Sequence, residues 1–394
     1  MGKTIAKKNY LTIHERCKLI DFHVHPALKT YLFCTKFYKR HKAGGAWNPL
    51  RVRVDLPKLT EGGVNGIFSA IYCPEKEMLD DCMPLRMAIG FLGLFSKKFR
   101  GISKGNRFDE TMKMIDSFEN TVSSAVKKGF QNVKIARSRA EFEEFLDKGK
   151  LTIVHSIEGG HSLGGKLENL EKFFNRGVAL LTLAHFYENE IGQTVGGIID
   201  SKKMFGCFKH SVIQEGGLSD FGRDVVEEMI RMGMLIDMTH CTLKARQEIF
   251  EINNNRRPLI CSHVGVQARF QHPINLTDDD IKKIAGCGGT ICVIFMNHWL
   301  SEKPQKDGLD LIVKTIEHIR KKTGTDFISV GTDFDGFTDP PDDIKDIAEM
   351  PKFTESLLKA GFKETDIEKI LGENALRVIR AGWGGKTGPD PVSY

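Results

Sequence analysis

Runs of apolar residues with the length of a β-strand recur eight times along the chain. They cover residues 19–24, 66–72, 151–157, 178–184, 234–239, 258–262, 289–296 and 327–332. Parallel strands that are buried on both faces have continuous apolar sequences, whereas strands with one face in water alternate between apolar and polar residues. The pattern therefore predicts a sheet of buried parallel strands.

Stretches with apolar residues at helical spacing separate most of these runs. They cover residues 109–128, 139–148, 167–175, 220–232, 243–252, 278–285 and 309–322. Strands that alternate with helices predict an α/β fold, here a (β/α)8 TIM barrel that forms a single domain over residues 1–394. An open doubly wound sheet is the alternative, but no Gly-x-Gly-x-x-Gly motif follows an early strand.

Two segments depart from the regular repeat. Residues 74–132 hold more chain than one connecting helix needs, so an insertion or a lid is expected there. Residues 365–378 have apolar residues on one side of a predicted helix, which begins with a capping box formed by Thr365 and Glu368.

The composition is that of an ordinary globular protein, with 41% hydrophobic and 27% charged residues. The formal net charge of +6 is spread along the chain, with basic enrichment at residues 36–42 and 97–104. Neither stretch carries a nucleic-acid-binding motif, so we interpret both as solvated faces and expect no nucleic-acid partner. No uncharged apolar run is long enough for a membrane-spanning helix.

Nine cysteines form no Cys-x-x-Cys pair, and their number is odd. A reducing compartment explains this most simply. The N-terminal residues 1–8 are polar and basic, and no apolar segment of signal-peptide length follows them. We therefore expect a cytoplasmic location and no membrane anchor.

Polar residues with possible catalytic roles follow the predicted strands. His23 and His25 are two residues apart in the first strand, so their side chains share one face of it. Further residues of this kind stand at the ends of five later strands: Glu158, His185, His240, His263 and Asp333. Each has a structural explanation when taken alone, such as a helix cap. Since the active site of a barrel lies at the carboxyl ends of its strands, the set as a whole predicts a catalytic centre.

The chemistry that fits this set is hydrolysis at two divalent metal ions, which share and acidify a water molecule to give a metal-bridging hydroxide. Zinc is the expected metal, although other divalent ions are possible, because histidine is its commonest neutral ligand. The expected roles are these: His23 and His25 bind one ion, His240 and His263 bind the other, Glu158 bridges them, Asp333 transfers the proton, and His185 contacts the oxygen of the attacked carbonyl.

The motifs that contain these residues resemble those of the membrane (renal) dipeptidase family of metallopeptidases, within the amidohydrolase superfamily. The most specific are Glu158-Gly159-Gly160-His161 and Gly331-Thr332-Asp333-Phe334-Asp335-Gly336, and the similarity extends from about residue 18 to residue 382. The resemblance implies a (β/α)8 barrel and zinc-dependent hydrolysis of dipeptides or related small amides. It also implies the same roles for Glu158, His185, His240, His263 and Asp333.

Two departures from the family affect the expected substrate. His25 stands where the dipeptidases have an aspartate, which removes one negative charge from the site. Ile274 precedes Asn275 where they have an arginine for the substrate carboxylate, and the nearest arginine is Arg269. Glu190, shortly after His185, would favour a substrate with a free amine. We therefore name Arg269, Asn275 and Glu190 as candidate substrate-binding residues and expect weak dependence on a free C-terminal carboxylate.

Two other functions remain open at this point. One is a different binuclear-metal amidohydrolase that acts on an N-acyl amino acid, a lactone or a cyclic amide. The other is a barrel that binds a small molecule without turnover, although the complete set of candidate ligands argues against it. The expected partner is a small-molecule substrate, and a homodimer is possible.

Overall fold

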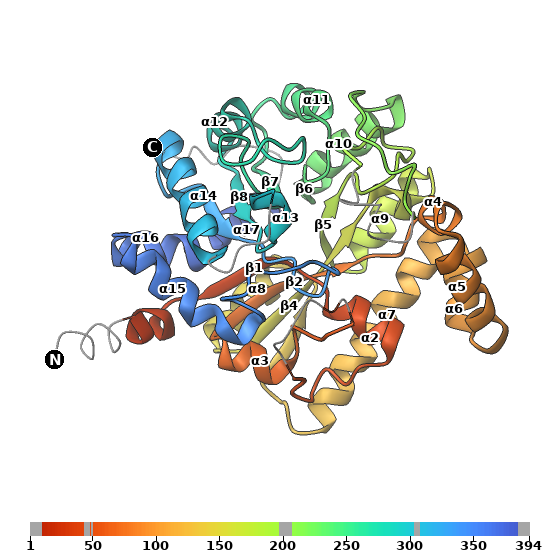
Figure 1. Ribbon diagram of the computed structural model, residues 1–394, viewed down its shortest axis with the longest axis horizontal. Helices are drawn as coiled ribbons and strands as arrows, with labels where there is room; N and C mark the ends of the chain where they lie inside the picture. The colour runs from red at the N-terminus through yellow and green to blue at the C-terminus, as the bar shows by residue number, and fades with distance from the viewer. Residues whose placement is uncertain (1–9, 43–47, 49, 197–206, 303–307, 385–394) are drawn as a thin grey trace.

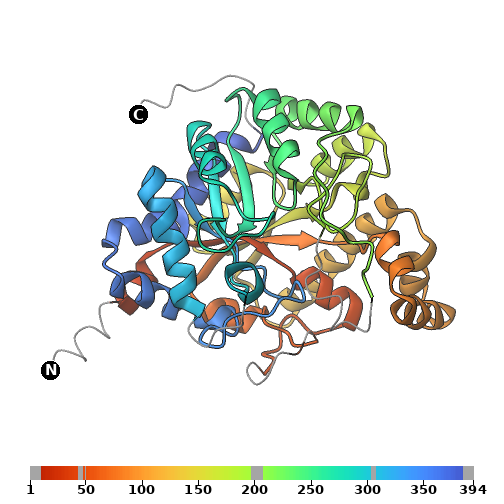
Figure 2. The same cartoon turned by 45° about the horizontal axis from the view of Figure 1, so that its top comes forward.

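The computed structural model describes residues 10–42, 48, 50–196, 207–302 and 308–384. Eight parallel strands close into a barrel: β1 (Leu19–Val24), β2 (Val64–Ile71), β4 (Leu151–Glu158), β5 (Val178–Thr182), β6 (Leu235–Asp237), β7 (Leu259–Val264), β8 (Thr290–Val293) and β9 (Ile328–Val330). Their order is β2-β1-β9-β8-β7-β6-β5-β4, and β2 pairs with β4 to close the sheet. Helices surround the barrel in Figures 1 and 2. The predicted (β/α)8 barrel is confirmed, and the open sheet is wrong.

One further strand, β3 (Val133–Ala136), was not predicted. It pairs in parallel with Leu151–Val154 in the first half of β4, whereas the second half of β4 pairs with β5. β3 therefore lies beside the closed barrel. It has only four residues, and Lys134 is exposed, so its sequence lacks the continuous apolar run of the other strands.

The seven helices that the sequence predicted between strands are present. They are α7 (Arg107–Lys127), α8 (Arg139–Asp147), α9 (Leu167–Asn175), α10 (Asp220–Met232), α11 (Leu243–Asn253), α12 (Asp278–Gly286) and α14 (Gly308–Thr323). Several begin at a polar residue whose side chain accepts a hydrogen bond from the first helical turn. Ser219 and Thr242 do so for α10 and α11, and Thr277 forms a full capping box with Asp280 at the start of α12.

The capping box predicted at Thr365 is wrong. The N-cap of helix α16 (Glu364–Glu368) is Lys363, two residues before Thr365, and it makes no side-chain hydrogen bond. The chain continues through a π-helical turn, η3 (Lys369–Glu373), into α17 (Asn374–Gly382). The turn brings Gly372 so close to the Lys18 carbonyl that a Cβ atom could not fit. Only glycine therefore fits at position 372 of this turn.

Three short helices, α4 (Lys76–Asp81), α5 (Met83–Phe95) and α6 (Lys97–Lys104), lie between β2 and α7. They fall within the segment 74–132, where an insertion was expected, and α5 and α6 stand at the outer edge of the molecule in Figure 1. A disulfide joins Cys82, at the start of α5, to Cys207. The cysteine spacing gave no sign of this pair, and the expectation of reduced cysteines does not hold for it. A lid function for the segment stays a prediction.

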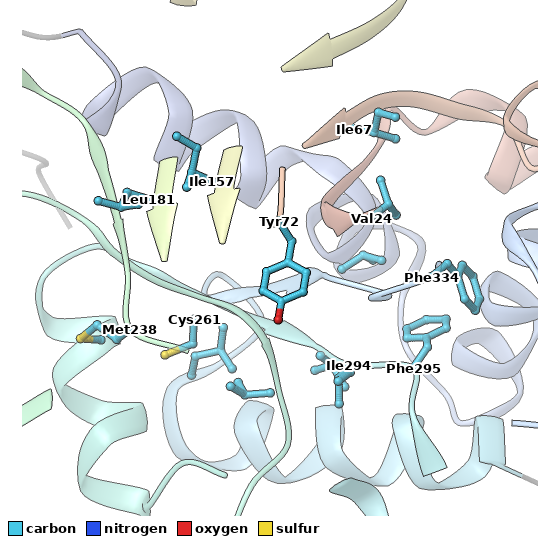
Figure 3. Packing of buried hydrophobic residues seen from close by; sticks show 14 of the residues in the cluster. Val24, Ile67, Tyr72, Ile157, Leu181, Met238, Cys261, Ile294, Phe295 and Phe334 are labelled. Carbon is cyan, nitrogen blue, oxygen red and sulfur yellow. The ribbon is translucent and has the colours of Figure 1, made fainter. Parts of the chain in front are cut away.

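The other helical segments are short. They are α2 (Pro26–Phe33), α3 (Leu56–Glu61), η1 (Gly160–Leu163), α13 (Asn297–Leu300), η2 (Ile347–Glu349) and α15 (Met350–Lys359). Side chains from strands and helices pack together in the core, where Figure 3 shows Val24, Ile67, Ile157 and Phe295 among the buried residues. Of the residues described, no helix is both long and apolar enough to cross a membrane. The basic N-terminal residues 1–8, on which the predicted absence of a signal peptide depends, lie outside the described part.

Candidate active site

Four imidazoles converge on one carboxylate at the carboxyl ends of the strands. The Nε2 atom of His23 lies 3.2 Å from Glu158 Oε1, and that of His25 lies 3.4 Å from Glu158 Oε2. From the other side of the barrel, His263 and His240 place their Nε2 atoms 3.5 and 3.7 Å from Oε1. All five side chains are buried. The structure thus brings together all five residues that the sequence named as possible metal ligands.

The spacing of these atoms fits two metal ions. Four ligands about 2.05 Å from a tetrahedral zinc ion lie about 3.3 Å from one another. The Nε2 atoms of His23 and His25 are 3.0 Å apart, and those of His240 and His263 are 3.2 Å apart. Each pair forms a possible metal-binding group with Glu158. Glu158 also raises the pKa of His23 to about 9 against the effect of burial, which indicates a strong preference for positive charge at this point.

A buried carboxylate, Asp237, fixes the orientation of the ligand rings. It accepts hydrogen bonds from the hydroxyls of Ser262, at 2.5 Å, and Thr182, at 2.6 Å. The single hydroxyl hydrogen of Ser262 is thereby used, so Ser262 Oγ can only accept from His263 Nδ1, 2.8 Å away. The proton of His263 must then reside on Nδ1, which leaves the lone pair of Nε2 directed at Glu158. This is the form of histidine that binds a metal ion.

A second buried carboxylate, Asp21, joins β1 to β9. It accepts hydrogen bonds from the backbone N–H groups of His23 and Thr332 and from the Thr332 hydroxyl. Burial raises the pKa of Asp21 to about 6 despite these bonds. The link places Asp333 beside the histidines, with its Oδ1 atom 3.2 Å from His25 Nε2. Asp333 has a φ of 56°, a left-handed conformation that is uncommon outside glycine and typical of functional sites.

His185, at the end of β5, is held by a carboxylate that the sequence analysis missed. Its Nε2 atom lies 3.7 Å from Glu158 Oε2, and its Nδ1 atom lies 2.8 Å from Glu75 Oε1. Glu75 also accepts hydrogen bonds from the Tyr72 hydroxyl and the Phe186 N–H. Burial alone would raise the pKa of Glu75, but the His185 ring and these hydrogen bonds lower it to about 2. Glu75 is therefore a pure acceptor, and His185 Nδ1 must donate to it.

That assignment limits what His185 can do. In the neutral ring, only Nδ1 carries a proton, and Nε2 can then only accept. Nε2 can donate to a substrate oxygen only when the ring is an imidazolium. Burial acts against the charged ring, but Glu158 and Glu75 outweigh it and raise the pKa of His185. Glu75 thus favours the protonation state that a donor to a carbonyl oxygen needs.

Trp299, in α13, forms an aromatic wall beside the second pair of histidines. Its indole is stacked on His263 with ring centres 6.0 Å apart and lies edge-on to His240 at 5.5 Å. His272 stacks on Trp299 from its own loop, with ring centres 6.3 Å apart. The sequence analysis did not identify Trp299 or His272 as part of the site, because a single tryptophan in an apolar stretch is usually an ordinary core residue.

The three candidate substrate-binding residues lie outside this cluster. Arg269 is exposed, and no side-chain hydrogen bond or ion pair joins it to the described part of the chain. Ile274 is buried. Asn275 is also buried, and its amide is fully used by three backbone groups, those of Gly265, Phe270 and Trp299. Asn275 thus holds the loop in place, and its contact with a substrate stays a prediction without support from the geometry.

Glu190 is exposed and lines a cavity of about 550 Å³ together with Lys76, Arg107 and His161. The five clustered residues do not line this cavity. His161 Nε2 donates a hydrogen bond to the backbone carbonyl of Cys73, 2.7 Å away. Glu190 therefore shares a cavity with His161, which follows the end of β4, but no hydrogen bond or ion pair joins it to the described residues of the cluster.

A (β/α)8 barrel with histidines and a shared carboxylate at the carboxyl ends of its strands defines a class of metal-dependent hydrolases. The chain matches the model of the membrane dipeptidase family, peptidase family M19, over residues 7–382. It therefore belongs to this family of metallo-dipeptidases.

Curated and solved relatives agree with this assignment. The dipeptidase tcpJ of Claviceps purpurea is 26% identical over 330 residues, which cover 83% of this chain and 68% of the relative. The structure of the probable dipeptidase PvdM from Pseudomonas aeruginosa has a TM-score of 0.74 at 20% identity, covering 95% of this chain and 98% of that one. A metallo peptidase from Rhodobacter sphaeroides, liganded with a phosphinate mimic of the dipeptide L-Ala-D-Ala, has a TM-score of 0.71 at 20% identity, with 93% and 99% covered. At these identities the solved structures establish the fold.

Proposed function

We propose that this metallo-dipeptidase binds two zinc ions and hydrolyses dipeptides or related small amides. His23 and His25 would hold one ion and His240 and His263 the other, and the Glu158 carboxylate, which lies within 3.7 Å of all four rings, would be shared between them. The observation that carries the proposal is the spacing of the ligand atoms, 3.0 to 3.7 Å, around the Glu158 carboxylate. The dipeptide mimic bound by the Rhodobacter sphaeroides relative supports the substrate class.

The bound ions would act as Lewis acids and lower the pKa of a water molecule towards neutrality. Asp333 would accept a proton from the attacking water, and its Oδ1 atom, 3.2 Å from His25 Nε2, supports this role. It would then deliver the proton to the departing amine. His185 would donate from Nε2 to the carbonyl oxygen, where negative charge develops. Glu75 and Tyr72 act through His185, so they are positioning residues.

The specificity of the site is part of the same proposal. The buried Ile274 cannot bind a carboxylate, and an unpaired carboxylate in a site without water costs several kcal/mol. We therefore infer a substrate whose C-terminal carboxylate contributes little to recognition, with Glu190, and Glu188 in the lining of the same cavity, favouring a free amine. If Arg269 does bind the carboxylate, its exposed side chain must turn towards the cluster.

The same loop favours a second candidate function. A cyclic amide or a lactone has no free carboxylate, so it would not need the arginine that Ile274 replaces. A screen of zinc-reconstituted enzyme with L-L dipeptides, L-D dipeptides, N-acyl amino acids, cyclic amides and lactones separates the two. Preferred turnover of dipeptides supports the first function, and turnover of cyclic amides or lactones alone would replace it with the second.

The predicted cytoplasmic location receives no support from the cysteines. All nine lie in the described part of the chain, and Cys82 forms a disulfide with Cys207. Disulfides are typical of oxidising compartments, so this pair argues against the cytoplasm.

A further inference from the structure

The outer surface of α5 is apolar and exposed. Met83, Met87, Phe91, Leu94 and Phe95 have exposed fractions between 63% and 79%. These residues are spaced at intervals that place them along one side of a helix. Large apolar side chains that stand together on a surface mark an interaction site more often than isolated ones do.

The opposite side of α5 packs against the rest of the protein. Ile89 and Gly93 are the only buried residues among the thirteen of the helix. Gly93 lies against the backbone of Arg100, where a Cβ atom would meet it at 3.3 Å. Helix α6 thus covers one side of α5 and leaves the apolar stripe directed away from the protein.

Helices α5 and α6 form a hairpin, and every charged residue in the segment 82–108 that contains it is basic. Residues 82–108 contain no aspartate or glutamate. They contain six basic residues, a charge equal to the formal net charge of +6 of the whole chain: Arg86, Lys97, Lys98, Arg100, Lys104 and Arg107. Lys97, Arg100 and Lys104 share one side of α6 by their spacing, and none of them forms an ion pair with a described carboxylate. The stretch 97–104 thus presents exposed basic side chains on the helix that packs against α5.

Other residues fix the hairpin to the barrel. Lys98 donates to the carbonyl of Leu32 at the end of α2, at 3.2 Å, and the buried Arg107 donates to the carbonyl of Pro74 at 2.8 Å. The disulfide of Cys82 and Cys207 holds the start of α5. The hairpin is therefore a fixed part of the fold, and whatever it binds is held at a set orientation to the barrel.

We propose that α5 and α6 dock on the surface of an anionic lipid bilayer. The apolar stripe of α5 would enter the boundary between head groups and acyl chains, and Lys97, Arg100 and Lys104 would contact the anionic head groups. Charge complementarity selects this partner over a second copy of the chain. A two-fold symmetric contact would place one hairpin, with no acidic residue, against another of the same charge.

Binding to vesicles tests the proposal. The purified metal-loaded protein is sedimented with vesicles of phosphatidylcholine alone and of phosphatidylcholine mixed with phosphatidylserine. We expect binding to the mixed vesicles only, weakened by salt. The variant Lys97→Gln/Lys104→Gln should bind about thirtyfold more weakly, since each cation near an anionic surface contributes roughly a factor of five. Phe91→Ser/Phe95→Ser should bind about a hundredfold more weakly.

Matched controls carry the same changes elsewhere. Lys127→Gln/Lys128→Gln removes two exposed charges at the far end of α7, and Leu50→Ser removes an exposed apolar side chain. Both should bind vesicles as the wild type does, and thermal unfolding confirms that every variant is folded. Absence of wild-type binding to the mixed vesicles, or equal losses in the control variants, overturns the proposal. A dimer in ultracentrifugation that Phe91→Ser/Phe95→Ser dissociates, without vesicle binding by the wild type, would assign the stripe to a second copy instead.

Discussion

Replacement of Glu75 by glutamine tests how His185 is held. The side chain keeps its shape, and its remaining oxygen can still accept from His185 Nδ1, but the negative charge is lost. Glu75 is 1% exposed, so no water compensates for the change. A hydrogen bond to a charged group contributes about 1.5–3 kcal/mol and a neutral one about 0.5–1.5 kcal/mol, a difference of roughly 1–1.5 kcal/mol. We therefore expect kcat/KM to fall about tenfold in Glu75→Gln.

The assay is kcat/KM for a dipeptide, measured with zinc-reconstituted enzyme whose metal content is determined in parallel. Glu75 contacts His185, which is not a candidate metal ligand, so the metal content of Glu75→Gln should not change. Tyr72→Phe removes only one of the hydrogen bonds to Glu75 and should have a smaller effect. Glu171→Gln, an exposed change of the same kind on α9, is the control. A kcat/KM for Glu75→Gln within twofold of wild type, at unchanged metal content, would refute the proposed role of Glu75.

Asp333→Asn should retain its metal ions and lose most of kcat, because an amide cannot accept the proton; near wild-type kcat would show that the base lies elsewhere. Amidation of a dipeptide substrate at its C-terminus should lower kcat/KM by less than about a hundredfold, roughly 2.7 kcal/mol, because Ile274 offers the carboxylate no charge. The His155 and Arg176 side chains lower the pKa of Glu119 to about 2 against the effect of burial. Glu119 therefore stabilises the fold above about pH 4.5 and loses this effect as the pH falls towards 2. The difference in urea unfolding free energy between wild type and Glu119→Gln should then shrink from pH 5 to pH 3. A difference that stays constant over this range would contradict the stabilising role of the Glu119 charge. The double variant Cys82→Ser/Cys207→Ser should lose about 2–4 kcal/mol of stability, and an unchanged thermal midpoint would show that the disulfide contributes nothing.

The sequence predicted the barrel because its signal is physical and local. A strand buried on both faces needs a continuous apolar run, and each of the eight barrel strands has one. β3 was missed because it has four residues and an exposed lysine in the middle. The capping box at Thr365 was wrong because the N-cap of α16 is Lys363, so Thr365 lies inside the first turn of the helix.

The candidate ligands were predictable for the same reason, since each one ends or follows an apolar run. Their supporting residues were not. Glu75 lies in a loop, and its partner His185 is 110 positions further along the chain. Asp237 is one polar residue inside a strand, and the pairing of β6 with β5 and β7 brings it to Thr182 and Ser262. A single sequence does not show which residues from distant parts of the chain come into contact in the fold.

The metal content of the purified protein, measured after reconstitution with zinc and removal of the excess, distinguishes a two-metal site from a single-metal site. Glu158 and the two histidine pairs provide more ligand atoms than one tetrahedral ion can use. Elemental analysis should therefore give two zinc ions per chain, and His240→Ala/His263→Ala should reduce the number to one. A content of one ion or none in the wild type would contradict the account of a two-metal site.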